Sequence, residues 1–120
     1  MRAFLRGFVY AFQGLGYAAC TQRNLRIHLA IASLVIVVGW ALQVTAVEWA
    51  VLGLTIGVVI SAELVNTVAE LAVDLLTQEY HPMAKVAKDV GAAAVLVTAL
   101  TAVGVGIAIF GPRLWRLFFG

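Results

Sequence analysis

Hydrophobic residues dominate this chain in three long runs that are separated by short polar segments. The first run is nearly continuous from Ile27 to Leu42, the second starts near Ala46 and continues to about Leu76, and the third follows Pro82. A transmembrane helix needs roughly 20 predominantly apolar residues to cross about 30 Å of hydrocarbon. The pattern predicts three transmembrane helices, over about 27–43, 46–72 and 88–110.

A fourth helix is predicted over about 2–19, where apolar residues recur at helical spacing but polar residues interrupt them too often for a span. The apolar positions are Phe4, Leu5, Phe8, Val9, Phe12 and Leu15, and the interruptions include Arg2, Arg6 and Gln13. Aromatic residues beside arginine suit the headgroup layer, so this segment is interpreted as an interfacial amphipathic helix. A helix that covers the protein's own core fits the same pattern equally well.

Composition places the whole chain, residues 1–120, in one membrane-embedded domain of the all-α class. Of its 120 residues 63% are hydrophobic and only 12% are charged, whereas soluble domains carry about 25% charged residues. The formal net charge of +2 leaves no basic patch for nucleic acid, which we exclude as a partner. Cys20 is the only cysteine, so the sequence offers no internal disulfide and no thiolate metal cluster.

The arginines and lysines predict the orientation of the spans, because such residues are enriched in cytoplasmic segments. Basic residues precede the first span and follow the second, which places the N-terminus and the connection between the second and third helices in the cytoplasm. Two further arginines fall on the opposite side, against this rule. The first group comprises Arg2, Arg6, Arg23, Arg26, Lys85 and Lys88, and the second comprises Arg113 and Arg116.

Glu63, Asn66, Glu70 and Asp74 are spaced by three, four and four residues. This spacing confines them to roughly 80° of a helix that turns about 100° per residue, so they form one polar stripe. Ionisable groups at membrane depth are costly unless they are paired, hydrated or bound to metal, and they commonly mark function. The stripe is predicted to cross the cytoplasmic boundary, where a soluble and a lipid substrate can meet.

Depth suggests separate roles for the two glutamates of this site. Glu63, deeper and partly desolvated, suits a general base, and Glu70, nearer to water, suits Mg²⁺ binding. Lys88 is a candidate to neutralise phosphate oxygens, and Asp89 to orient Lys88 or to join the metal shell. The alternatives are a hydrogen-bond ladder that only fixes helix packing and a surface Lys-Asp ion pair. We interpret His28 as an interfacial residue bonded to a neighbour.

These residues resemble the prokaryotic diacylglycerol kinase and undecaprenol kinase family of small trimeric membrane enzymes. The motifs that carry the resemblance are RNLRIH at 23–28, ELVNTVAE at 63–70 followed by Asp74, EYH at 79–81 and AKDVGAAAVL at 87–96. The resemblance covers most of the chain, with the motifs in the family's order.

The resemblance implies an ATP- and Mg²⁺-dependent kinase that phosphorylates the hydroxyl of a membrane lipid. It further implies a homotrimer with shared active sites, embedded as a multi-pass protein in the bacterial inner membrane with those sites facing the cytoplasm. Glu63 would be the general base and Glu70 the metal ligand. The nucleotide would be bound by Tyr10, Gln22, Asn66, Glu70, Glu79, Tyr80, His81, Lys88 and Asp89.

Two points stay open at the level of the sequence. Gln22 stands where the diacylglycerol kinase branch has a second metal-binding glutamate, so that ligand is unassigned. The Arg-Ile-His and His-Pro-x-Ala-Lys stretches look more like the undecaprenol kinase branch, yet both undecaprenol and diacylglycerol remain candidate acceptors. The rival interpretation is a non-enzymatic helical membrane protein, a transporter subunit or assembly factor, whose stripe conducts ions or fixes packing.

Overall fold

A computed structural model describes all 120 residues. It contains four helices and no strand. Their bounds are α1 Arg2–Thr21, α2 Arg23–Ala41, α3 Ala46–Leu76 and α4 Pro82–Phe119. Three of them, α2, α3 and α4, are long and apolar enough to cross a membrane. The structure thus confirms the predicted all-helical fold with three membrane-spanning helices.

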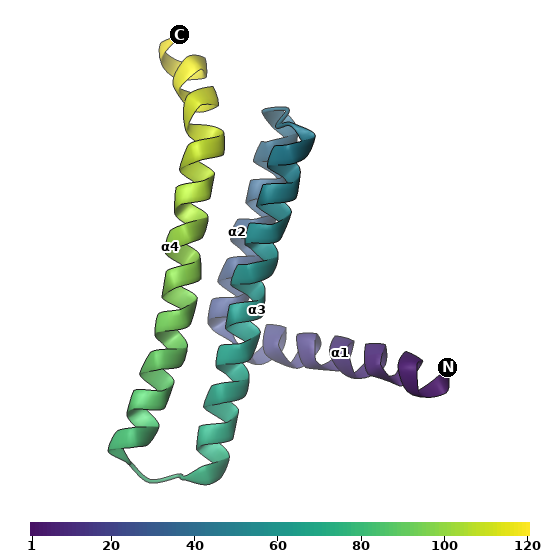
Figure 1. The fold of residues 1–120 in the computed structure, drawn as a ribbon, viewed down its shortest axis with the longest axis vertical. Helices are drawn as coiled ribbons and strands as arrows, with labels where there is room; N and C mark the ends of the chain where they lie inside the picture. Colours follow the sequence, from purple (N-terminus) through teal and green to yellow (C-terminus); the bar gives the residue numbers. More distant parts are fainter.

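The three long helices run side by side, alternately up and down, and α1 projects nearly perpendicular to them (Figure 1). The α3–α4 pair makes the most extensive contact, whereas α1 touches α2 and α3 only near its C-terminal end. Arg26 helps to form this corner, because its Nη1 donates to the Cys20 carbonyl oxygen over 2.9 Å. A bundle with one helix at right angles is the shape expected of spans that carry an interfacial helix.

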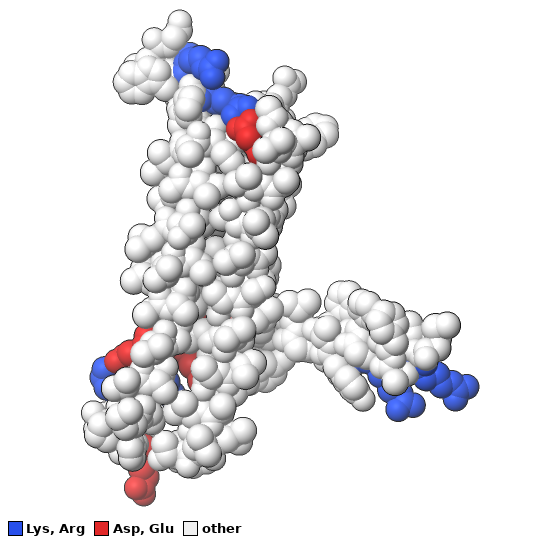
Figure 2. Space-filling model, viewed as in Figure 1, with Lys and Arg blue, Asp and Glu red and all other residues white.

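Charged side chains lie at the two ends of the bundle and on α1 (Figure 2). Between the two ends the visible surface is uniformly uncharged, as the hydrocarbon layer requires. The chain is therefore a multi-pass membrane protein.

Local capping explains where two of the helices begin. Thr45 Oγ1 accepts from the Glu48 amide over 3.2 Å, and Glu48 Oε1 accepts from the Thr45 amide over 3.1 Å, so the pair forms a capping box at the start of α3. Pro82 occupies the first turn of α4, and His81 Nδ1 accepts from the Met83 amide. The polar connection between α3 and α4 therefore ends at His81, the residue that caps α4.

A small hydrophobic core lies where the α2–α3 connection meets the far end of α4. Its buried members are Val44, Leu52, Ile109 and Phe110. Gln43, in the connection, adopts a left-handed conformation with φ of 53°. The amides of Gln43 and Val44 then bond to the Trp40 and Gly39 carbonyl oxygens, which closes the end of α2.

Arg113 is fixed at this same end by a bidentate ion pair with Glu48. Its Nη1 and Nη2 lie 2.6 and 2.8 Å from the two carboxylate oxygens, and Nη1 also donates to the Ile109 carbonyl oxygen over 2.9 Å. A fork-to-fork pair of this kind is strong and directional. One of the two arginines that contradict the charge rule for membrane orientation is therefore paired with an acidic residue.

Candidate active site

Glu63 and Asn66 are buried side by side on α3, about halfway along the bundle. Glu63 is 3% exposed and Asn66 9% exposed, and both Glu63 Oε1 and Asn66 Oδ1 lack a hydrogen-bond donor. Thr67, also buried, donates to the Glu63 carbonyl oxygen rather than to the carboxylate. Two unsatisfied buried acceptors are costly, and such groups characteristically mark functional sites. The pair is therefore the strongest candidate for the centre of a functional site.

His28 on α2 is the side chain closest to the Glu63 carboxylate among the polar contacts of the chain. Its Nε2 lies 3.3 Å from Glu63 Oε1. The distance allows contact, but the geometry falls short of a full hydrogen bond, so Oε1 still counts as unsatisfied. We expected His28 to bond to a neighbour at the interface, and the neighbour is the predicted general base.

Asn66 is clamped between α3 and α4. A Cβ atom on Gly91 of α4 would collide with Asn66 Oδ1, so glycine is what allows the amide to lie against this helix. Asn66 Nδ2 donates to Glu70 Oε1 one turn further along α3, over 3.5 Å. Gly91 therefore positions Asn66, and Asn66 in turn contacts Glu70.

The stripe continues from Glu70 to a polar hollow of about 610 Å³ at the α3–α4 connection. This volume falls in the range of roughly 300–1,000 Å³ that small-molecule sites occupy. Five of the predicted nucleotide-binding residues line it together with the end of the stripe. They are Glu79, Tyr80, His81, Lys88 and Asp89, and Asp74 and Lys85 join them.

The ion pairs of this hollow differ from those proposed on spacing. Lys88 Nζ lies 2.6 Å from Asp74 Oδ1, and Asp89 pairs with Lys85 over 2.6 Å. Asp89 therefore does not orient Lys88. A side chain four residues along the same helix is nearer to Asp89 than its sequence neighbour is, because adjacent residues point about 100° apart. Asp74, which we had placed in the stripe without a role, holds the lysine.

Two predicted nucleotide-binding residues lie apart from the hollow in the single chain. Tyr10 is 65% exposed on α1, which projects away from the bundle (Figure 1). Gln22 lies at the α1–α2 corner, and its side chain donates only to Thr21 Oγ1 over 3.4 Å. The chain thus gathers five of the predicted nucleotide ligands in one hollow and leaves these two elsewhere.

The residues fit a Mg²⁺ ion that arrives with a nucleotide. No group of three or more histidine, cysteine or acidic side chains gathers in the chain, so the protein alone does not form a complete metal cage. Mg²⁺ is usually held by one or two carboxylates together with substrate phosphates. The Glu70 carboxylate supplies oxygen ligands of this kind, and the Asn66 amide that donates to it lies beside it.

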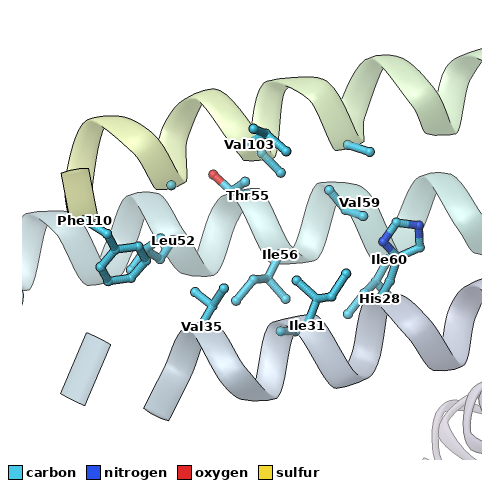
Figure 3. Close-up of a pocket in the computed structure, with 14 residues that line it drawn as sticks. His28, Ile31, Val35, Leu52, Thr55, Ile56, Val59, Ile60, Val103 and Phe110 are labelled. Carbon is cyan, nitrogen blue, oxygen red and sulfur yellow. The ribbon is translucent and has the colours of Figure 1, made fainter. Parts of the chain in front are cut away.

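An apolar groove of about 280 Å³ ends at His28, the residue that contacts Glu63. It lies between α2, α3 and α4, with His28 at one end and Phe110 at the other (Figure 3). Along its length it is lined by aliphatic side chains, including Ile31, Val35 and Val103. The groove and the polar hollow thus lie at different levels of the bundle, with the buried part of the stripe between them.

The sequence did not predict the contact that His28 makes, nor the groove it borders. Hydropathy identifies spans but not how each helix is rotated about its axis, and this rotation decides which side chains meet. The available signal was a histidine near the mouth of an apolar span, since ionisable groups at that depth commonly have a partner.

Comparisons with known proteins show the family of this chain. The family described as prokaryotic diacylglycerol kinase matches residues 9–110. The chain is 40% identical to the undecaprenol kinase of Bacillus subtilis over 114 residues, which cover 95% of this chain and 93% of that protein. It is 46% identical to a diacylglycerol kinase of Synechocystis over 94% of this chain and 65% of that protein.

A more distant relative is the diacylglycerol kinase of Escherichia coli, 32% identical over 78% of this chain and 77% of that protein. All these relatives are named as kinases, which decides against the non-enzymatic alternative. The family match spans α2 and α3 entirely, together with most of α4 and the larger part of α1. This chain therefore belongs to the prokaryotic diacylglycerol kinase family, a family of lipid kinases.

Proposed function

We propose that the protein transfers the γ-phosphoryl group of ATP to the hydroxyl of a membrane lipid, undecaprenol or diacylglycerol, at the cytoplasmic face of the inner membrane. One observation carries the proposal: an unsatisfied buried carboxylate, Glu63, lies between an apolar groove and a polar hollow that contains Lys88. In this proposal the lipid chain occupies the groove and the nucleotide occupies the hollow, with the carboxylate at a level between them.

The chemistry follows from the positions of the side chains. Glu63 Oε1 accepts the proton of the lipid hydroxyl, and the oxygen attacks the γ-phosphorus as the bond to the β,γ-bridging oxygen breaks and ADP leaves. Lys88 lies within the polar hollow, where an ammonium group can balance phosphate charge. Bound Mg²⁺, held by Glu70, would supply further charge neutralisation.

Two features support the proposed homotrimer with shared sites. Tyr10 and Gln22, implied as nucleotide ligands, lie away from the hollow of their own chain. The long helices also bury few of their residues within one chain. In the most apolar 18-residue stretch of each helix, only 17 to 28% of the residues are buried. A neighbouring copy could bring its α1 to a hollow that is incomplete in one chain.

The direct test is an assay of purified wild-type protein with labelled ATP, in bilayers that contain undecaprenol and diacylglycerol in competition. We expect label in one of the two lipids, and the ratio identifies the acceptor. The Glu63→Gln variant, purified in the same way, measures the background from contaminating kinases. Label in neither lipid, above that background, would exclude the proposed reaction.

Narrowing the apolar groove should weaken lipid binding selectively. The Ala102→Phe substitution places a ring among the lining residues. Each buried methylene of a lipid chain contributes about 0.8 kcal/mol to binding. If the ring excludes two methylenes from the groove, KM for the lipid should rise about tenfold. KM for ATP should not change.

Leu100→Phe is the matched control for this substitution. Leu100 lies on the same helix, is 62% exposed and does not line the groove. An unchanged KM for the lipid in Ala102→Phe, with a disrupted oligomer, would instead assign the groove to contact between subunits.

A further inference from the structure

His28 is the one polar side chain that contacts the Glu63 carboxylate, and it comes from a different helix. The contact joins Nε2 to Oε1 over 3.3 Å, with 19% of the histidine side chain and 4% of the glutamate side chain exposed. None of the residues predicted to bind nucleotide or metal lies on α2. The position of α2 relative to α3 therefore determines the immediate surroundings of the carboxylate.

The Glu63 carboxylate contacts His28 but does not form a hydrogen bond of ordinary geometry with it. Oε1 has no hydrogen-bond donor in satisfactory geometry, and the nearest hydroxyl, Thr67, is used by the Glu63 main chain. Catalytic hydrogen bonds are often long or poorly aligned before substrate binds and shorten in the complex. The 3.3 Å contact has the character of such a bond.

His28 also forms the end of the apolar groove nearest to Glu63 (Figure 3). A lipid chain in the groove would pass the imidazole immediately before its hydroxyl reaches the carboxylate. The same side chain therefore borders both the proposed chain site and the proposed base. A rearrangement at His28 on lipid binding would be transmitted directly to Glu63.

We infer that His28 is a positioning residue for Glu63. Its Nε2–H donates to one carboxylate lone pair and fixes the carboxylate orientation, so that another lone pair is directed to the lipid hydroxyl. His28 neither takes up the transferred proton nor touches the phosphoryl group. This inference rests on the proposed function, since it assigns a role in the same reaction.

The test compares three substitutions that differ in the donor they retain. His28→Phe keeps an aromatic ring but removes the hydrogen-bond donor. His28→Gln places an amide N–H at about the position of Nε2. The side chain in His28→Asn also carries an amide N–H, but it is too short to reach Glu63. We expect His28→Phe and His28→Asn to lower kcat about tenfold, since misplaced catalytic groups lose rate steeply. We expect His28→Gln to recover most of kcat, with KM for ATP unchanged throughout.

Ser33→Ala is the matched control on the same helix, because Ser33 is exposed and bonds only to the Leu29 carbonyl oxygen. Thermal unfolding and oligomer size are measured for every variant. If His28→Phe does not fold, the comparison of His28→Gln with His28→Asn decides the question alone. Equal kcat in these two, or wild-type kcat in His28→Phe, would overturn the inference. Inactive wild-type protein would instead overturn the proposed function.

Discussion

Replacing Glu63 by glutamine is expected to lower the rate of phosphate transfer about a thousandfold, because the amide cannot accept the hydroxyl proton. Glutamine has nearly the same volume and keeps an oxygen that can face His28, so the buried site should stay packed. ATP binding should be unchanged, since the polar hollow is lined by other residues. The measurement is the initial rate of labelled phosphate transfer, together with oligomer size.

Glu48→Gln provides a matched control for this experiment. It makes the same chemical change on the same helix, but at the opposite end, where Glu48 binds Arg113. It should lower the midpoint of thermal unfolding by a few degrees and leave the transfer rate as in wild type. If Glu63→Gln were as active as wild type, Glu63 would not be the base.

The second large effect is expected from Gly91→Ala. The added Cβ would collide with Asn66 Oδ1, and a shift of the buried Asn66 side chain away from α4 would alter its contact with Glu70. Displacement of a site residue by about 1 Å can cost about a hundredfold in rate, and we expect a loss of kcat of this size. Steady-state kinetics with varied ATP and Mg²⁺ would measure it.

Gly104→Ala is the control, because Gly104 lies on the same helix and a Cβ there meets nothing within 4 Å. Alanine also favours helix by about 1 kcal/mol over glycine, so both variants share this small stabilising effect. A Gly91→Ala enzyme with the kinetics of Gly104→Ala would show that the Asn66 amide is not held against α4 in the working enzyme.

The starts of α3 and α4 were predictable because each has a local chemical cause. The capping residue Thr45 lies one position before the predicted start of α3, and Pro82 opens α4. The stripe from Glu63 to Asp74 was likewise predictable, since spacing along one helix fixes which residues share a face.

What could not be predicted were the contacts between helices. The partners of Glu63, Lys88 and Arg113 depend on how the helices pack, and apolar residues on nearly every face of a span leave that packing open. Gly91 illustrates the difference. Small residues in a transmembrane helix are typical of close helix contact, but they do not reveal the partner, and Gly91 accommodates Asn66 of the same chain.

The Glu48–Arg113 pair has a consequence for the biogenesis of the protein. The two residues are 65 positions apart in the chain, so during synthesis Glu48 is made long before its partner. The pair therefore forms only after α4 has been made and has packed against α3. Once formed, it opposes displacement of α4 along the bundle, because withdrawal of α4 would break two hydrogen bonds and draw a cation into hydrocarbon. The ion pair thus holds this end of α4 at the edge of the apolar part of the bundle.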